Sequence, residues 1–243
     1  MKGVILAGGL GTRLHPLTRV TNKHLLPVFD KPMIHYPIQA LVAAGIEEVL
    51  VVTGGNFAGE FLHILRNGRD FGLRRMHYAY QEGEGGIADA LALAEDFADG
   101  EPIAVMLGDN IIEKNIIAAV AAFRENPRGA RILLKEVSDP ERFGVPEIEG
   151  ETIKRIVEKP TEPPSRFAVI GIYLFDNRVF DVIKTLEPSS RGELEITDVN
   201  NYYIRRSEMR YSILDGWWTD AGTFQSLLRA SNLVAEGGAN KRG

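Results

Sequence analysis

The chain contains no cysteine among its 243 residues. Disulfide bonds, thiolate catalysis and zinc sites with cysteine ligands are therefore excluded, and the fold does not need an oxidising compartment. No apolar run approaches the length of a membrane span, and the first one, Val4-Ile5-Leu6, is too short for the hydrophobic region of a signal peptide. These absences favour a cytoplasmic protein without a membrane partner.

Positively charged residues are fewer than negatively charged ones. The chain has 28 Lys and Arg against 33 Asp and Glu, a net charge of −5. This balance argues against a nucleic-acid partner but permits a local basic site for a small phosphate-bearing molecule. The composition, 44% hydrophobic and 25% charged, is that of an ordinary globular protein. We expect a single domain over residues 1–236 and a disordered tail over residues 237–243.

The hydrophobic pattern of the first third alternates between strands and helices. Strands are predicted at Lys2 to Ala7, Glu48 to Thr53 and Arg75 to Tyr80, with helices at Ile34 to Ala44 and Phe57 to Asn67. This βαβαβ order predicts an α/β fold with a parallel, doubly wound sheet.

Further along the chain the pattern changes. Pro102 to Leu107 is a continuous apolar run and is the expected centre of the sheet, and a helix is predicted over Ile111 to Asn126. From Ala130 the sequence indicates strands with longer loops. One of these strands, Phe167 to Phe175, contains Gly171, a residue type that inside a strand marks close approach of another group to the backbone.

A glycine-rich loop follows the first strand. Gly8, Gly9 and Gly11 lie within four positions and are followed by Arg13 and, further on, Lys23. Glycines let backbone N–H groups approach phosphate oxygens, and the two cations offset the phosphate charge. The segment therefore suits a polyphosphate, at the sheet edge where α/β folds bind ligands.

Spacing excludes the two best-known phosphate loops. The dinucleotide fingerprint needs a glycine where Leu14 stands, and the P-loop needs Gly-Lys-Ser/Thr where Gly8 is followed by Gly9-Leu10. Without the two cations, a simple tight turn would be the better interpretation of the loop. Lys23 by itself would be an ordinary solvated lysine.

A second loop at a strand end runs from Gln81 to Gly86. A glutamine amide offers a donor and an acceptor side by side, which matches the edge of a pyrimidine base, and Gly86 would leave room for the ring. A flexible acidic turn is the alternative interpretation of this segment.

Two aspartates follow strands at the same predicted edge. Asp109 comes directly after the central strand, and Asp220 lies just past the last one. Carboxylates in these positions suit a divalent cation beside a phosphate. Each could instead cap the helix that follows it. Glu158 beside Lys159 suits a ligand with hydroxyls and a phosphate, although for that dipeptide taken alone a surface ion pair followed by a proline turn is the better interpretation.

Seven motifs in order over Lys2 to about Ala230 carry a family resemblance. They are Leu6-Ala7-Gly8-Gly9-Leu10-Gly11-Thr12-Arg13-Leu14, Lys23 to Val28, Lys31-Pro32-Met33, Gly108-Asp109-Asn110, Glu158-Lys159-Pro160, Arg191 to Asp198, and Trp218-Thr219-Asp220-Ala221-Gly222-Thr223. With them the sequence resembles the sugar-1-phosphate nucleotidyltransferases, most closely a short form of the glucose-1-phosphate thymidylyltransferases. His24 stands where many relatives carry glutamine.

The resemblance implies a Rossmann-like three-layer α/β/α sandwich with a mainly parallel central sheet. Residues 1–110 would form the nucleotide-binding half and residues 111–236 the sugar-phosphate-binding half. The implied substrates are dTTP and glucose 1-phosphate, with dTDP-glucose and pyrophosphate as products, Mg²⁺ as cofactor and a homo-oligomer as the assembly. UTP or another hexose 1-phosphate is the nearest alternative, and a non-catalytic binding subunit is a more distant one.

The resemblance also implies a role for each matching residue. Arg13, Lys23, Asp109 and Asp220 would be catalytic, and the two aspartates would bind the metal. The remaining nucleotide contacts would be Gly8, Gly9, Gly11, Thr12, Gln81 and Gly86. The sugar-phosphate contacts would be Asn110, Gly144, Glu158, Lys159 and Val169.

Overall fold

A computed structural model of the protein describes residues 1–242. The strands are β1 (Lys2–Ala7), β2 (Pro27–Val28), β3 (Lys31–Pro32), β4 (Glu48–Gly54), β5 (Arg75–Gln81), β6 (Ile103–Leu107), β7 (Asn110–Ile112), β8 (Ala130–Glu136), β9 (Gly144–Glu149), β10 (Thr152–Glu158), β11 (Phe167–Phe175), β12 (Met209–Ile213) and β13 (Trp218–Asp220). The α-helices are α1 (His35–Ala43), α2 (Ala58–Leu65), α3 (Ile87–Ala92), α4 (Glu95–Ala98), α5 (Ile117–Glu125), α6 (Val179–Ile183), α7 (Ile196–Arg205) and α8 (Phe224–Gly237).

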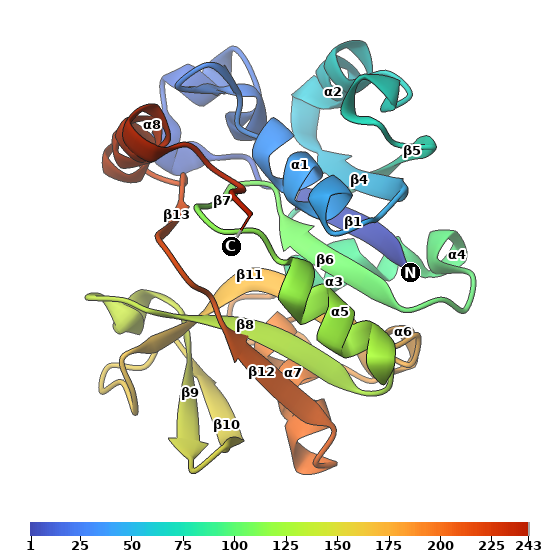
Figure 1. The fold of residues 1–243 in the computed structure, drawn as a ribbon, viewed down its shortest axis with the longest axis vertical. Helices are drawn as coiled ribbons and strands as arrows, with labels where there is room; N and C mark the ends of the chain where they lie inside the picture. Colours follow the sequence, from blue (N-terminus) through green and yellow to red (C-terminus); the bar gives the residue numbers. More distant parts are fainter. Residues whose placement is uncertain (243) are drawn as a thin grey trace.

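One large sheet runs through the molecule in the order β10-β9-β11-β6-β1-β4-β5, with β8 and β12 attached through β11 (Figure 1). Strands β6, β1, β4 and β5 are parallel, so their carboxyl ends lie along one edge, as the sequence predicts. Strand β11 pairs with β6 in the antiparallel direction and joins the second half of the chain to the first. The two halves therefore share one sheet.

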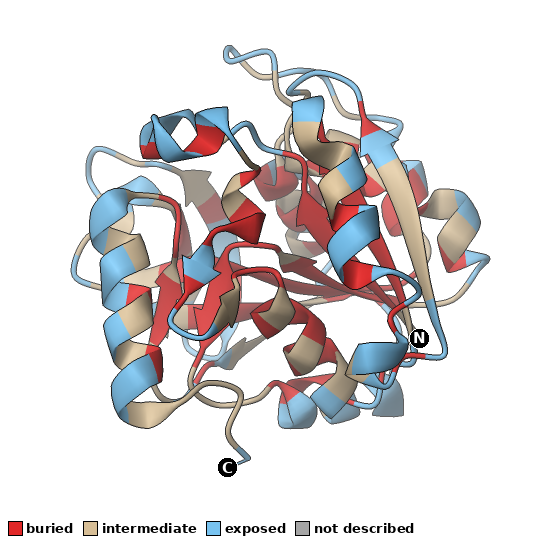
Figure 2. Cartoon of the chain, turned by 90° about the horizontal axis from the view of Figure 1, so that it is seen from above, coloured by how far each residue is buried: buried red, intermediate tan, exposed pale blue. Residues whose placement is uncertain are grey.

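Helices cover both faces of this sheet, and each face has its own apolar core. On one face Phe61 of α2 and Phe123 of α5 are buried together. On the other face Leu91 of α3, Phe180 of α6 and Tyr203 of α7 are buried together. Figure 2 shows the buried strands between helices whose outer faces are exposed. The predicted three-layer architecture is confirmed, and strands buried on both faces explain the continuous apolar runs in the sequence.

The structure differs from the sequence prediction directly after Asp109. No helix begins there; Asn110–Ile112 instead forms β7, which pairs antiparallel with β13, and helix α5 starts only at Ile117. The pairing sets Asp220 opposite Asn110. More than a hundred residues separate β7 from β13 along the chain, so no local pattern in the sequence indicates that they pair. The local pattern after Asp109 favoured a helix for this reason.

The C-terminal segment also differs from the expectation of disorder. Helix α8 begins at a capping box formed by Thr223 and Ser226 and continues to Gly237. Beyond it, the Asn240 N–H donates to the Ile112 carbonyl at 2.9 Å and the Asn240 side chain donates to the Tyr36 carbonyl at 3.0 Å. Residue 243 lies outside the described residues.

Within residues 1–242 no helix is long and apolar enough to cross a membrane.

Candidate active site

The glycine loop leaves β1 at the sheet edge and turns into a short 3₁₀ helix, Thr12–Leu14. Gly11 has φ +66°, and a Cβ on it would lie 3.0 Å from Cβ of Lys23. Only glycine combines this left-handed conformation with such close packing. The loop therefore folds directly against Lys23, as the sequence suggests.

Lys23 forms an ion pair with Asp109 from the end of β6. Lys23 Nζ lies 2.6 Å from Asp109 Oδ2, and both side chains are mostly buried. Burial by itself would raise the pKa of Asp109, but the Lys23 ammonium holds that pKa well below its usual range. Asp109 is thus a carboxylate at neutral pH, within reach of the glycine loop.

Asp220 is the second carboxylate of this centre. Its neighbour Ala221 donates its N–H to the Asp109 carbonyl at 2.9 Å. Burial raises the pKa of Asp220 to about 6, and the negative charge of Asp109 acts in the same direction. Arg142 Nη2 lies 3.6 Å from Asp220 Oδ2 and offsets part of this repulsion.

Two neighbouring carboxylates that repel each other fit a divalent cation. Their oxygens are hard ligands of the kind that such cations take, and the remaining positions can be filled by water and substrate phosphates. Within residues 1–242 no group of three or more His, Asp or Glu residues forms a complete protein cage for a metal. The two aspartates fit a cation that is shared with a bound phosphate.

Two adjoining cavities open at this edge of the sheet. The first has a volume of about 380 Å³ and lies beside the glycine loop. The second has a volume of about 320 Å³ and lies towards β9, β10 and α7. Side chains that line both include Arg13, Asp109, Lys159 and Arg191.

The predicted site residues divide between these cavities. Those lining the first are Gly8, Gly9, Arg13, Lys23, Gln81, Gly86, Asp109 and Lys159. Those lining the second include all five predicted sugar-phosphate residues together with Asp220: Asn110, Gly144, Glu158, Lys159, Val169 and Asp220. In the described part of the chain, Gly11 and Thr12 line neither cavity, so the structure gives Gly11 the role of shaping the loop.

The Glu158-Lys159 pair is held in place from two sides. Thr197 on α7 donates its hydroxyl to Glu158 Oε2 at 2.6 Å. Lys159 has φ +42°, which is uncommon for a residue with a side chain, and its N–H donates to the Phe143 carbonyl at 2.9 Å. Backbone strain of this kind concentrates at functional sites. It supports a role for Lys159 at the junction of the cavities.

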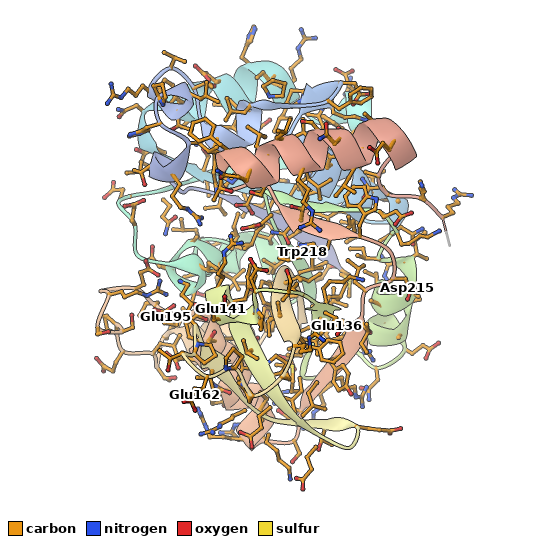
Figure 3. All side chains as sticks on the ribbon, turned by 90° about the vertical axis from the view of Figure 1, so that its left-hand side faces the viewer. Glu136, Glu141, Glu162, Glu195, Asp215 and Trp218 are labelled. Atoms are coloured by element: carbon orange, nitrogen blue, oxygen red, sulfur yellow. The ribbon has the colours of Figure 1, made fainter. Side chains whose placement is uncertain are left out.

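Both the nitrogen and the oxygen of the Asn110 side-chain amide form hydrogen bonds within the protein. Its Nδ2 donates to Asp109 Oδ1 at 3.1 Å, and its Oδ1 accepts from Trp218 Nε1 at 2.7 Å and from the Gly171 N–H at 3.2 Å. A Cβ on Gly171 would lie 2.8 Å from Asn110 Nδ2, so the close approach that the sequence predicts at this glycine is confirmed. Figure 3 shows Trp218 near the middle of the molecule, below α8.

Several residues of the site have no role assigned from sequence. Arg191 lines both cavities and lies 2.8 Å from Glu195 Oε2 and 3.7 Å from Glu158 Oε1. Thr197 and Arg142 contact Glu158 and Asp220 respectively. For Arg191 and Thr197 the only sequence signal was the motif Arg191 to Asp198, which marks the segment without saying which side chains face the site; Arg142 lies outside every motif.

His24 is a buried histidine whose ring nitrogen Nδ1 lies 2.8 Å from Asn22 Oδ1. Burial, followed by the positive charge of Lys23, lowers the pKa of His24 to about 3. It is neutral at physiological pH. His24 is thus a buried, hydrogen-bonded histidine.

Parallel strands with a glycine loop, two cations and two carboxylates near their carboxyl ends are typical of α/β proteins that bind nucleotides. The chain belongs to the nucleotidyl transferase family, whose model matches residues 2–237.

Relatives agree with this assignment. The chain is 41% identical over 237 residues to a glucose-1-phosphate thymidylyltransferase from Actinoplanes sp., covering 96% of this chain and 78% of the relative. It is 43% identical to one from Neisseria gonorrhoeae, covering 96% of this chain and 82% of the relative.

Solved structures agree as well. The fold is similar, with a TM-score of 0.92 and 50% identity, to a Bacillus anthracis protein assigned as a glucose-1-phosphate thymidylyltransferase and crystallised with a sucrose; 96% of this chain and 94% of that one are covered. It is also similar, at a TM-score of 0.84 and 26% identity, to UDP-glucose pyrophosphorylase complexed with UDP-glucose, covering 97% and 98% of the two chains.

Proposed function

We propose that this protein transfers a thymidylyl group from dTTP to glucose 1-phosphate, giving dTDP-glucose and pyrophosphate. One observation carries the proposal: two cavities of similar size meet at Arg13 and Asp109. A reaction between two bound anions needs such an arrangement, because each substrate requires its own pocket and their phosphates must meet. The names of the relatives supply the identity of the substrates.

The first cavity suits the nucleotide. The backbone of Gly8 and Gly9 and the cations Arg13 and Lys23 offer a cradle for the triphosphate. Gln81 also lines this cavity and would offer its side-chain carbonyl oxygen to the base. In this proposal the α-phosphate would lie near the Lys23–Asp109 ion pair.

The second cavity suits the sugar phosphate. Glu158 presents a carboxylate that accepts hydrogen bonds from sugar hydroxyls, and Lys159 presents a cation to the phosphate. Gly144 lies beside the Glu158 carboxylate, where a Cβ would be 3.4 Å from Glu158 Oε2, so glycine keeps this wall of the cavity free of a side chain. Val169 contributes an apolar wall.

The reaction is a direct displacement at phosphorus. An oxygen of the sugar phosphate attacks the α-phosphorus, a new P–O bond forms, and the bond to the bridging oxygen breaks so that pyrophosphate leaves with the electron pair. The second pKa of a phosphate monoester is about 6, so the nucleophile is already anionic and no general base is required. Arg13 and Lys23 stabilise the negative charge on the transferring group.

Asp109 and Asp220 would hold Mg²⁺ in this proposal. The bound ion would add positive charge to offset that of the phosphates. Asn110 keeps the Asp109 carboxylate in position through the 3.1 Å hydrogen bond from its Nδ2. The Lys23 ammonium keeps the same carboxylate ionised.

A substrate panel tests the proposal. Pyrophosphate release is measured with four nucleoside triphosphates against glucose, mannose and galactosamine 1-phosphates, and dTTP with glucose 1-phosphate should give the highest kcat/KM. A preference for UTP would support the activity named for the more distant neighbour, a UDP-glucose pyrophosphorylase. Absence of pyrophosphate with every pair would support a non-catalytic binding subunit instead.

Two further expectations stay predictions. Light scattering would test the homo-oligomeric state, and the cytoplasmic location is likewise untested.

A further inference from the structure

The Gln81 side chain, at the end of β5, has both of its amide hydrogens engaged. Its Nε2 donates to Asp89 Oδ2 at 2.7 Å and to the Gly86 carbonyl at 3.2 Å. Gln81 lines the nucleotide cavity and is only 6% exposed, so few orientations are open to it. The amide group is therefore held by two acceptors on the loop and helix that follow β5.

Asp89 decides which way this amide faces. It lies in the first turn of α3, and its carboxylate only accepts hydrogen bonds. If the amide were reversed, Gln81 Oε1 would face the carboxylate and the Gly86 carbonyl, and both hydrogen bonds would be replaced by contacts between oxygens. The chemistry of the two partners fixes the orientation.

The loop is shaped around this contact. A Cβ on Gly85 would lie 2.5 Å from Asp89 Oδ2, so a side chain at Gly85 would displace the carboxylate from Gln81. At the other end of the amide, a Cβ on Gly8 would lie 2.5 Å from Gln81 Oε1. The carbonyl end of Gln81 thus faces the glycine loop, along the wall where Leu6, Ile87 and Ala90 offer apolar contacts to a base.

This fixed acceptor distinguishes pyrimidine bases. Thymine and uracil carry a hydrogen on ring nitrogen N3, whereas N3 of cytosine carries a lone pair and would face the Gln81 oxygen with no hydrogen between them. We propose that Asp89 is a positioning residue for base selection: it orients Gln81 so that the cavity favours a pyrimidine nucleotide whose ring nitrogen N3 carries a hydrogen over a cytosine nucleotide. The inference rests on the proposed nucleotide site, and it makes no distinction between thymine and uracil.

Equilibrium binding tests the inference without relying on turnover. Titration calorimetry measures Kd for dTTP and for dCTP with Mg²⁺ present and sugar phosphate absent. The wild type should bind dTTP more tightly, and Asp89→Ala should lower the ratio of the two affinities about tenfold, the effect of one hydrogen bond. Asp89→Asn keeps the shape and one acceptor oxygen, so it should retain more of the ratio than Asp89→Ala.

A double variant separates positioning from a general effect on the fold. If Asp89 acts through Gln81, Asp89→Ala should cause no further loss of selectivity when Gln81 is already replaced by alanine. Asp96→Ala, at an exposed aspartate on the neighbouring helix α4, is the matched control and should leave the ratio unchanged. Circular dichroism checks folding, and Asp89→Ser replaces Asp89→Ala if the alanine variant does not fold.

The results separate the two proposals. An unchanged dTTP to dCTP ratio in Asp89→Ala, an equal loss in the Gln81→Ala background, or a wild type that does not discriminate would each overturn the inference. A wild type that discriminates through Asp89 but releases no pyrophosphate with any substrate pair would leave the inference standing and refute the proposed transfer reaction.

Discussion

His24 should make the protein less stable as the pH falls from about 7.5 to about 5.5. Burial, and then the charge of Lys23, lowers the pKa of His24 to about 3 from the ordinary value of 6.5. The unfolded chain therefore binds a proton in this range while the folded chain does not. Because the unfolded state binds more protons, the free energy of unfolding must fall as the pH falls.

The magnitude follows from the two pKa values. Between pH 7.5 and 5.5 the unfolded histidine changes from mostly neutral to mostly charged, which corresponds to a loss of about 1.4 kcal/mol, and a further loss of about 1.3 kcal/mol follows by pH 4.5. Asp220, whose pKa is raised to about 6, acts in the opposite direction because its folded state binds the proton more tightly. The quantity to compare is therefore the difference between the wild type and a variant that lacks only His24.

His24→Gln supplies that variant. Urea unfolding at both pH values should show that the wild type loses about 1.4 kcal/mol more than His24→Gln over the interval. His63→Gln removes an exposed histidine on α2 and should keep the wild-type pH profile. Equal pH dependence in the wild type and His24→Gln would refute the reasoning, because the buried ring would then not be the source of the proton linkage.

Three further predictions concern the site and its support. Asp109→Asn should abolish magnesium-dependent pyrophosphate release while circular dichroism stays native; a wild-type rate would remove Asp109 from the metal site. Gly171→Ala should lower the free energy of unfolding by roughly 1–3 kcal/mol, because the new methyl group would lie 2.5 Å from the Leu107 side chain; an unchanged urea midpoint would contradict this. Thr197→Val removes the 2.6 Å hydrogen bond to Glu158 and should raise KM for the sugar phosphate about tenfold with little change for dTTP; an equal rise for both substrates would count against separate cavities.

Much of the fold could be predicted because its signals are local. The strand residues Val4 to Ala7 and Ile103 to Leu107 are all apolar, since parallel strands with helices on both faces have no solvated side. The helix predicted at Phe57 to Asn67 is observed as α2, because its apolar residues recur at helical spacing. The pattern failed after Asp109, where the tertiary pairing of β7 with β13 outweighs the local preference for a helix.

The sequence predicted which types of residue form the candidate site, but it predicted few of the contacts between them. Carboxylates, glycines and cations that follow parallel strands must gather at one edge, so Lys23 and Asp109 could be expected near each other. Nothing in the sequence indicated that Asn110 holds Asp109, or that Asp89 holds Gln81. These contacts depend on side-chain orientation, which the spacing of residues along the chain does not specify.

The sequence by itself determined a parallel α/β sheet, a phosphate-binding loop at its edge and the chemical types of residue around it, because strand burial and turn chemistry are encoded over a few neighbouring residues. The tertiary structure decided how Asp220, already expected at the same edge as Asp109, is set opposite Asn110, and it alone decided that two cavities meet there. Both depend on β13 returning to β7 and on β11 joining the second half of the chain to β6. Pairings over such distances are set by the packing of the whole chain, and only the folded protein brings their residues into contact.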